Sequence, residues 1–406
     1  MKNWETVKLG DLCEVLTKGT TPTSIGFKFL NSGINFIKVE SLSETGNIIP
    51  NKVAYIGEDC NKAMNRSQLQ KNDILFSIAG ALGRIGIVKE EILPANTNQA
   101  LAIIRLKRDS NILVNFLTKY FNSNNISDEI DKLRIGAAQQ NLSLTQLRNL
   151  SIPLPPLPEQ QRIVSILDEC FAAIDQAKAN AEQNLKNARE LFESYLQGVF
   201  EKRGEGWELS RMGDICRIND GTHFSPKNGN DGAYMYVTAK NIKPYYLDLS
   251  NITYVSEVDH KEIYARCAPV KGDVLYIKDG ATAGIAAINS IEAEFSLLSS
   301  VALIKCSDKI LNTFLVHYMN STVGKKNFLG YIDGAAITRL TLVKIKNVCF
   351  PLPPLNEQQN IVHKLDTLRS ETQKLVTVYQ QKIASLEELK KSILKKAFAG
   401  ELSTVN

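Results

Sequence analysis

Side chains that could carry covalent or metal chemistry are present in this sequence, but their spacing fits no catalytic motif. The seven cysteines include no Cys-x-x-Cys pair and the four histidines are dispersed, so the pattern does not indicate a structural zinc site. The sequence also lacks a Gly-x-x-x-x-Gly-Lys-Ser/Thr phosphate loop, a His-Glu-x-x-His pair and the [DNS]-Pro-Pro-[YFW] turn of amino-methyltransferases. We therefore expect a non-catalytic chain that holds no metal and no cofactor.

Two pairs of aspartates recur at equivalent places and are the remaining candidates for acid–base chemistry. Asp11 and Asp214 each follow a glycine, and Asp73 and Asp273 each stand before a short apolar run. Because each of them precedes an apolar residue where a turn is expected, we interpret them as turn or cap residues and not as catalytic carboxylates.

The composition indicates a soluble globular protein. Of the 406 residues, 44% are hydrophobic and 22% are charged, which allows two or three domains with cores of their own. No stretch approaches the roughly 18–20 apolar residues that span a membrane, and no apolar run follows the N-terminus, so we expect a cytoplasmic protein with free, mostly buried cysteines. Residues 1–150 hold 18 lysines and arginines against 14 acidic residues, and residues 207–350 hold 16 against 14. This excess fits a polyanionic partner without requiring one.

The sequence contains an internal repeat, with an offset of about 200 residues between the two copies. Trp4-Glu5 returns as Trp207-Glu208, and Gly19-Thr20 returns as Gly221-Thr222. Lys-x-Asp-[Ile/Val]-Leu and Gly-Ala-Ala also occur once in each half. The longest match, Pro-Leu-Pro-Pro-Leu-x-Glu-Gln-Gln-x-Ile-Val, begins at Pro153 and again at Pro351. The sequence therefore encodes two similar units in tandem.

Each repeat begins with about 150 residues of mixed character, in which short apolar runs alternate with turns rich in Gly, Asn and Asp. Strands are predicted in the first repeat at residues 34–39, 74–78, 85–88 and 101–106, and in the second around residue 237 and at 274–277, 285–288 and 301–304. Helices are predicted at 112–121 and 310–319.

A long helix closes each repeat. The Pro-rich segment favours an extended chain, and after Pro158 no helix breaker follows until Gly198. Apolar residues then recur in alternating steps of four and three, which is typical of a coiled-coil seam. The first seam consists of Ile163, Leu167, Cys170, Ile174, Ala177, Ala181, Leu185, Ala188, Phe192, Tyr195 and Val199. The second seam consists of Ile361, Leu365, Leu368, Thr372, Leu375, Tyr379, Ile383, Leu386, Leu389, Ile393 and Ala397.

A single helix cannot bury so long a stripe, so we expect the two helices to pair, and a pseudo-two-fold axis makes the pair antiparallel. Two helices packed separately, each on its own domain, are the alternative. The predicted fold class is α+β: two similar α/β-mixed domains separated by two long helices that form an antiparallel coiled coil. The predicted parts are domain 1 at 1–150, a Pro-rich segment with the first helix at 151–203, domain 2 at 204–349, and a Pro-rich segment with the second helix at 350–406.

Such an arrangement would act as a ruler between two binding modules. At ~1.5 Å per residue, forty-odd helical residues span roughly 65 Å, and DNA sites one turn apart lie ~34 Å apart on the same face. Two diverged modules would then read two different half-sites. An assembly protein without a nucleic-acid partner and an enzyme with an unrecognised site are the alternatives. The positive charge of both domains disfavours the first, and the absent motifs disfavour the second.

The chain resembles a specificity subunit (HsdS) of type I restriction–modification systems over its whole length. The resemblance rests on the two Pro-Leu-Pro-Pro-Leu-x-Glu-Gln-Gln-x-Ile-Val segments, the Trp-Glu openings, the two Lys-x-Asp-[Ile/Val]-Leu sequences and the closing run from Ile393 to Leu402. One departure is Asn356, which stands in the second repeat where the first has Pro158.

The resemblance implies that each domain is a target-recognition domain, which reads a short half-site of double-stranded DNA through the major groove. It implies that the helices dock two modification subunits, which methylate adenine with S-adenosylmethionine, and that restriction subunits, where present, add an ATP-dependent nuclease. It implies no chemistry in this chain, in agreement with the missing catalytic motifs.

Base edges and phosphates are recognised by hydrogen-bond donors and acceptors at exposed loop positions. The sequence offers such groups in the Gly-Thr loops, at two strand ends, after the Gly-Ala turns and beside the Gly-Ala-Ala turns. The candidate DNA-binding residues are Lys18, Thr20, Thr21, Ser24, Lys38, Ser41, Arg84, Arg134, Gln139, Gln140, Thr222, His223, Ser225, Lys227, Lys240, Asn241, Lys278, Thr282, Thr338 and Arg339. Asn98-Gln99 either lies beside these groups or caps a buried strand.

Three polar residues open each long helix. They are Glu159, Gln160 and Gln161 in the first helix and Glu357, Gln358 and Gln359 in the second. A carboxylate is favoured at the positive end of a helix, so local capping is the first interpretation. A contact with the methyltransferase is the second.

Overall fold

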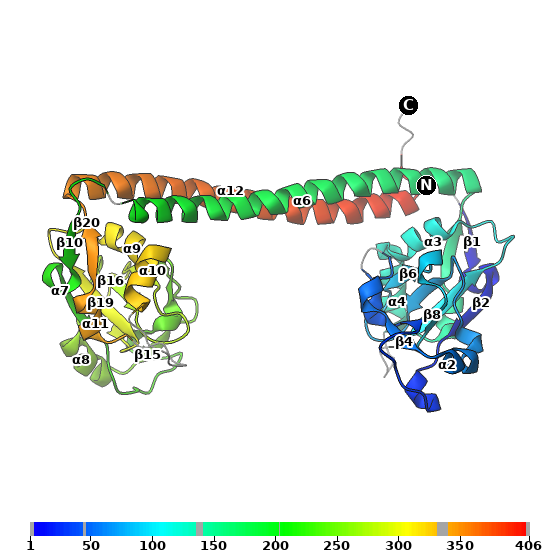
Figure 1. Cartoon of the computed structure of the whole chain (residues 1–406), viewed down its shortest axis with the longest axis horizontal. Helices are drawn as coiled ribbons and strands as arrows, with labels where there is room; N and C mark the ends of the chain where they lie inside the picture. The colour runs from blue at the N-terminus through cyan, green and yellow to red at the C-terminus, as the bar shows by residue number, and fades with distance from the viewer. Residues whose placement is uncertain (1–3, 44–45, 135–140, 203, 331–339, 403–406) are drawn as a thin grey trace. The chain divides into compact units, whose positions relative to one another are not determined.

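The computed structural model describes residues 4–43, 46–134, 141–202, 204–330 and 340–402 (Figure 1). The chain forms two compact units, one made of Met1–Ala181 with Gln381–Asn406 and the other of Glu182–Gln380. Domain 1 lies in the first unit and domain 2 in the second, and each unit includes a part of both long helices. The four-segment division of the sequence is a different partition and stays a prediction.

The centre of domain 1 is an antiparallel four-stranded sheet. In spatial order its strands are β2 (Cys13–Lys18), β8 (Leu101–Leu106), β5 (Ile74–Ser77) and β6 (Ile85–Ile87). Successive side chains of a strand point to opposite faces. Phe76 therefore enters one core and Leu75 enters another on the opposite face of the sheet.

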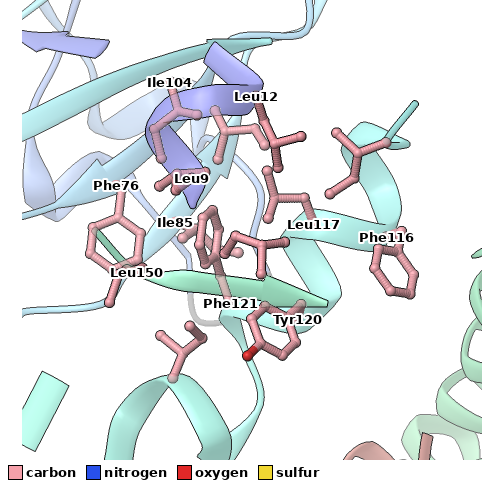
Figure 2. Close-up of a cluster of buried hydrophobic side chains, with 14 of the residues drawn as sticks. Leu9, Leu12, Phe76, Ile85, Ile104, Phe116, Leu117, Tyr120, Phe121 and Leu150 are labelled. Carbon is pink, nitrogen blue, oxygen red and sulfur yellow. The ribbon is translucent and has the colours of Figure 1, made fainter. Parts of the chain in front are cut away.

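Short helices cover the face of this sheet that carries Phe76. They are α1 (Leu9–Leu12), α3 (Val114–Phe121), α4 (Asn124–Arg134) and α5 (Leu144–Arg148). Leu9 from α1 and Leu117 from α3 meet Phe76 and Ile104 of the sheet in one buried cluster (Figure 2). The other face packs against a three-stranded sheet whose strands, in spatial order, are β4 (Ala54–Ile56), β3 (Ile34–Ile37) and β7 (Ala95–Thr97). The helix α2 (Glu58–Ala63) follows β4 in the chain.

Domain 2 repeats this architecture. Its four-stranded sheet has the order β11 (Cys216–Asp220), β19 (Val301–Cys306), β16 (Val274–Ile277), β17 (Ala286–Ile288). Its three-stranded sheet has the order β15 (Thr253–Val255), β12 (Tyr234–Val237), β18 (Ser296–Leu297). Its helices are α7 (Met212–Ile215), α8 (Glu257–Arg266), α9 (Asn312–Asn320), α10 (Thr322–Leu329) and α11 (Leu342–Asn347). A hairpin of β13 (Ile242–Lys243) and β14 (Tyr246–Leu247) is added.

The first and last motifs of each repeat pair with each other. In domain 1, β1 (Glu5–Lys8) lies antiparallel to β9 (Ser151–Leu154), with Glu5 opposite Leu154. In domain 2, β10 (Glu208–Arg211) lies antiparallel to β20 (Cys349–Leu352). The Trp-Glu and Pro-Leu-Pro sequences therefore recur together because they lie at the paired ends of one two-stranded ribbon, and the extended conformation predicted from the prolines is confirmed.

The predicted strands are found at each of the proposed places, with ends that differ by one or two residues. The predicted helix at 112–121 is α3, and its counterpart at 310–319 is α9. The two long helices are α6 (Leu157–Glu201) and α12 (Leu355–Phe398). Pro158 lies in the first turn of α6, where proline costs no helical hydrogen bond, and the helix continues through Gly198. Among the helices that the structure describes, none is long and apolar enough to cross a membrane.

Within the first unit, the start of α6 runs antiparallel to the end of α12. Asp175 accepts a bond from Lys390 at 2.9 Å, and Lys178, three residues further along α6, pairs with Glu387, three residues earlier in α12. The same packing joins the helices to domain 1, because Phe398 meets the ring of Phe116 edge-on at 5.4 Å. The expected helix pair and its alternative, packing on the domains, are therefore both present in this unit.

Within the second unit, the end of α6 lies beside the start of α12. The centroid of the Tyr245 ring lies 6.0 Å from that of Phe192 of α6 and 4.1 Å from Cζ of the guanidinium of Arg369 of α12. Phe200, near the end of α6, packs on Phe314 of domain 2 at 5.6 Å. The predicted antiparallel pairing is confirmed within each unit.

For three residues of the predicted coiled-coil seams the prediction of burial is wrong. Tyr195, Leu375 and Leu389 are 41%, 41% and 46% exposed. Near the end of α6 the buried positions are instead Leu196 and Phe200, which face domain 2. The apolar stripe of α6 departs from the coiled-coil spacing there because the end of this helix packs against the core of domain 2.

Candidate nucleic-acid interface

Several loops of domain 1 meet at one edge of its sheet through backbone hydrogen bonds. The Thr20 N–H donates to the carbonyl of Thr97 at 3.2 Å, and the Ile78 N–H donates to that of Ala100 at 2.9 Å. The Leu142 N–H donates to Ile78 at 2.9 Å. We call this surface the loop edge. In domain 1 its members are Lys18–Ser24, Lys38, Ile78–Arg84, Asn98–Ala100 and Leu142.

Domain 2 builds its loop edge with the equivalent bonds. The Thr222 N–H donates to Leu297 at 2.8 Å, and the Lys278 N–H donates to Ser300 at 2.9 Å. The Leu340 N–H donates to Lys278 at 2.9 Å. In domain 2 the members are Asp220–Lys227, Thr238–Lys240, Arg266, Lys278–Gly284, Leu298–Ser300 and Leu340. Polar groups that are far apart in the sequence are therefore brought together on both domains.

The Gly-Thr motif has a structural role at this edge. A Cβ atom on Gly19 would lie 1.9 Å from the carbonyl oxygen of Thr97, and one on Gly221 would lie 1.7 Å from that of Leu297. Thr222 is buried, and its hydroxyl accepts the N–H of Phe224 at 3.2 Å. The motif recurs because the backbone passes very close to another strand, and the prediction that Thr222 contacts DNA is corrected.

Ser41 and Asn241 are also structural residues. The buried Ser41 hydroxyl accepts the N–H of Lys38 at 3.1 Å and donates to the carbonyl of Lys52 at 2.8 Å. The Asn241 side chain accepts the N–H of Thr238 at 3.0 Å in the same kind of turn. Their polar atoms satisfy the backbone of these turns, so the prediction that they bind DNA is corrected.

A buried ion pair removes one further candidate. The Lys278 side chain is 3% exposed, and its Nζ lies 2.7 Å from a carboxylate oxygen of Asp279 and 3.7 Å from one of Asp220. Asp220 is buried as well and lies 3.2 Å from Nε2 of His223, which is half exposed. The prediction that Lys278 reaches DNA is corrected, because its charge is used inside domain 2.

The remaining candidates are distributed as follows. Those exposed at the loop edges are Lys18, Ser24, His223, Ser225, Lys227, Lys240 and Thr282. Those partly buried there are Thr20, Thr21, Lys38 and Arg84. Arg134 is the last residue of α4. The candidates Gln139, Gln140, Thr338 and Arg339 lie outside the described residues. All of these stay predictions.

Two further polar residues lie at the loop edges, one that the sequence left open and one that it did not predict. Gln99 is exposed and its side chain contacts the Thr21 hydroxyl, whereas its neighbour Asn98 caps the turn by accepting the Ala100 N–H at 3.2 Å. Arg266, at the end of α8, donates to the carbonyl of Gly221 at 3.1 Å. The Asn98-Gln99 pair was a visible signal, but nothing in the sequence links Arg266 to a loop more than forty residues earlier.

Of the polar residues that open the two long helices, some are buried and others are exposed. Gln160 is fully buried: its Oε1 accepts the N–H of Leu113 at 2.8 Å, and its Nε2 donates to the carbonyls of Asn111 and Pro155 at 2.9 and 2.8 Å. It therefore caps α3 and not its own helix. Gln358 is buried in the same way, so neither glutamine is available to a partner subunit and both predictions are corrected.

The other four helix-opening residues differ in exposure. Glu357 accepts the indole N–H of Trp207 at 2.7 Å, and Glu159 pairs with Arg162 at 2.7 Å. Gln161 and Gln359 are exposed. Among the six candidates for a partner contact, these last two are the ones whose side chains face solvent in the structure.

Titratable groups form no metal-binding cluster in the part of the chain that the structure describes. No three His, Cys, Asp or Glu side chains gather there as a metal site would require. Burial raises the pKa of Cys13 and of Cys267 to about 12, which keeps both thiols protonated and unreactive at neutral pH. Asp73 accepts the N–H of Gln70 at 2.7 Å, which confirms its role as a turn residue.

Comparison with known proteins gives consistent matches along the whole chain. The family model of the type I restriction modification DNA specificity domain matches residues 1–187 and, a second time, residues 204–387. The type I restriction enzyme MjaIX specificity subunit of Methanocaldococcus jannaschii is 23% identical over 99% of this chain and 94% of its own length. The type I restriction enzyme EcoBI specificity subunit of Escherichia coli is 33% identical over 43% of this chain and 36% of its own length.

Solved structures share the fold. A chain from a study of complex assembly and conformational transition of the type I restriction–modification system matches with a TM-score of 0.80 at 22% identity, over 99% of both chains. The HsdS subunit from Thermoanaerobacter tengcongensis matches with a TM-score of 0.67 at 20% identity, over 99% of this chain and 98% of that one. Both similarities extend through the two domains and the two long helices.

Proposed function

Since the chain belongs to the family of type I restriction–modification DNA specificity subunits, we propose that each of its two domains reads one half of a bipartite DNA target through its loop edge. The chain is the DNA-recognition subunit of such a system and is not its catalytic part. Reading by loops on a rigid sheet requires donors and acceptors that are held still and reach the base edges of the major groove.

One observation carries this proposal: the same loop edge is built twice, from equivalent backbone bonds, but it presents different side chains. Lys18 and Asp220 occupy the same place, because Lys18 lies opposite Ala102 in its sheet and Asp220 lies opposite Ala302. The first is exposed and cationic, and the second is buried and anionic. The exposed polar groups of the loop edges differ as well: they include Lys18 and Ser24 in domain 1 and His223, Ser225 and Lys227 in domain 2. A common scaffold with different exposed groups is what two different half-sites need.

Exposed cations at the loop edges support contact with the phosphate backbone. Lys18 in domain 1 and Lys227 and Lys240 in domain 2 are exposed. Each phosphate contact of this kind releases counterions, so binding should weaken as the salt concentration rises. We expect weak, salt-sensitive DNA binding by the chain alone, because part of the binding free energy of the whole complex would come from contacts between DNA and the partner subunits.

The long helices are proposed to set the spacing between the half-sites and to dock two adenine methyltransferase subunits. The exposed Gln161 and Gln359, at the starts of α6 and α12, support this role because they face solvent beside each domain. S-Adenosylmethionine and ATP would be held by methyltransferase and restriction subunits in the cytoplasm. No cofactor is proposed for this chain.

The test is to co-express the chain with its methyltransferase in a host without other adenine methyltransferases and to sequence the modified adenines. The proposal predicts methylation of one motif with two short half-sites and a fixed spacer, which disappears when the chain is omitted. Methylation that is independent of this chain, or that shows no bipartite motif, would contradict it.

A further inference from the structure

Arg266, the last residue of α8, is anchored to the loop edge of domain 2 by two hydrogen bonds. Its Nε donates to the carbonyl oxygen of Gly221 at 3.1 Å, and its Nη2 donates to Oδ1 of Asp220 at 3.0 Å. The Asp220 side chain is 3% exposed, whereas that of Arg266 is 51% exposed. A buried carboxylate thus fixes the direction of a guanidinium that reaches the surface.

We propose that Arg266 determines specificity by donating two parallel hydrogen bonds to a guanine of the half-site read by domain 2, and that Asp220 is its positioning residue. The proposal rests on the proposed function of the loop edge. Arginine has five N–H groups, and the two internal bonds use one on Nε and one on Nη2. The Nη1–Nη2 side of the fork is left to donate outward, and it matches O6 and N7 of guanine.

The buried neighbours of Asp220 make it a firm anchor. Lys278, itself 3% exposed, lies 3.7 Å from the second carboxylate oxygen of Asp220 and supplies an opposite charge that offsets the cost of burying it. A hydrogen bond between two charged groups is shorter and stronger than a neutral one. Arg266 therefore reaches DNA with its rotamer already fixed, which lowers the ordering cost of binding.

The arginine recurs in domain 1 as Arg66, five residues before Lys71 as Arg266 is before Lys271. The anchoring arrangement, however, occurs in domain 2 and has no equivalent among the described residues of domain 1. Lys18 takes the place of Asp220, and Ile78 takes the place of Lys278. The helix that supplies the arginine is also longer, since α8 has 10 residues and α2 has 6. The guanine contact should therefore affect one half of the target and leave the other half unchanged.

The test uses the full chain with its methyltransferase and measures both the methylated motif and binding to duplexes in which each base pair of the domain 2 half-site is changed in turn. The variants are Arg266→Gln, Arg266→Lys and Asp220→Asn. Lys261→Gln is the matched control, because Lys261 lies on the same helix in an exposed pair with Glu257 and not at the loop edge.

Arg266→Gln should weaken binding to the intact target by about 5- to 150-fold and abolish discrimination at one G·C pair. Arg266→Lys keeps the charge but not the fork, so it should relax the same base pair with a smaller loss of affinity. Uniform weakening on every duplex would identify a phosphate contact and overturn the proposal, as would unchanged discrimination. If the wild-type complex shows no motif at all, the proposed function itself fails.

Asp220→Asn tests the positioning role separately. It should relax discrimination at the same base pair as Arg266→Gln while leaving the other positions of the half-site as they are, a readout that a merely structural role would not produce. Wild-type discrimination in a folded Asp220→Asn chain would overturn the positioning role. Should that chain fail to fold, Arg266→Lys, which leaves Asp220 intact, decides the base contact.

Discussion

Gln358 accepts the backbone N–H of Leu311 at 2.9 Å, as Gln160 accepts that of Leu113 in the other repeat. Its Nε2 donates to the carbonyls of Lys309 and Pro353 at 3.0 and 2.9 Å. One buried amide in the first turn of each long helix therefore satisfies two backbone groups of the neighbouring domain and one of the Pro-rich segment before the helix. It ties the helix to the domain in a fixed orientation, and a fixed orientation is what a ruler between two half-sites would require.

Replacing Gln160 with alanine should destabilise the first unit by about 2–4 kcal/mol, because one buried and two partly buried backbone groups lose their partner. Chemical denaturation measures the loss, and hydrogen exchange of the Leu113 amide should become faster. Gln161→Ala is the control, since this neighbouring side chain is exposed, and it should change stability by less than about 0.5 kcal/mol. Equal effects of the two substitutions would show that the buried bonds do not hold the domain.

The sequence predicts the architecture well but misassigns several polar residues, and the reason is physical. A duplicated sequence, alternating apolar runs and a stripe with coiled-coil spacing each reflect local geometry, so strands, helices and helix pairing follow from them. Hydrogen bonds between distant segments leave no local pattern. Gln160 is 47 positions from Leu113 in the chain, and a helix-opening glutamine looks the same whether it caps its own helix or another.

Residues shared by both repeats are those that the scaffold needs. Gly19 and Gly221 stand at equivalent turns, where a Cβ atom would lie 1.9 and 1.7 Å from a carbonyl oxygen of another strand. Residues that would read different half-sites should differ between the repeats, as the exposed Lys18 differs from the buried Asp220 at the equivalent place. Repetition in the sequence therefore points toward structure, and candidates for DNA contact are better sought among exposed positions whose residue or anchoring differs between the repeats, as the anchoring of Arg266 does.

Alanine at Gly19 should destabilise domain 1 by about 2 kcal/mol or more, because its Cβ would lie 1.9 Å from the carbonyl oxygen of Thr97 and the strand would have to move. Thermal unfolding measures this. The matched control is Gly198→Ala in α6, where a Cβ meets no atom within 4 Å and alanine favours the helix. The control should stabilise the chain by about 0.5–1 kcal/mol. A neutral Gly19→Ala would mean that the Gly-Thr loop yields to the added methyl group.

Asp73→Asn should destabilise domain 1 by about 3 kcal/mol, because the buried carboxylate accepts bonds from Nε and Nη2 of Arg105 at 2.8 and 2.7 Å. Arg105→Lys should cost less, because Lys305 already pairs with Asp273 at the equivalent place in domain 2. Both variants are compared by chemical denaturation. A milder effect of Asp73→Asn than of Arg105→Lys would contradict this account of the pair.

The contact between domain 2 and α12 should weaken in acid. Asp366 on α12 lies 2.9 Å from Nε2 of His317, and this hydrogen bond holds the pKa of the Asp366 carboxyl below its usual value of 3.8. A carboxyl whose pKa is lower in the folded state stabilises the fold above its unfolded pKa, and this contribution is lost as the pH falls through the folded pKa. Stability should therefore drop below about pH 4.

The Asp366→Asn variant isolates this effect. Urea denaturation between pH 6 and pH 2.5 should show a shallower loss of stability for the variant than for the wild type. Asp231→Asn, in an exposed loop of domain 2, is the control and should follow the wild-type curve. Parallel curves for the wild type and Asp366→Asn would show that the His317 contact contributes nothing to the acid response.

The most direct measurement of the central claim is the methylated motif produced by two loop-edge variants in the co-expression host. One variant replaces the exposed Lys18 and Ser24 of domain 1 with alanine, and the other replaces the exposed His223, Ser225 and Lys227 of domain 2. Each variant is predicted to weaken or relax one half of the bipartite motif while the other half and the spacer stay unchanged. If both variants altered the same half, or if neither altered the motif, the assignment of one half-site to each loop edge would be contradicted.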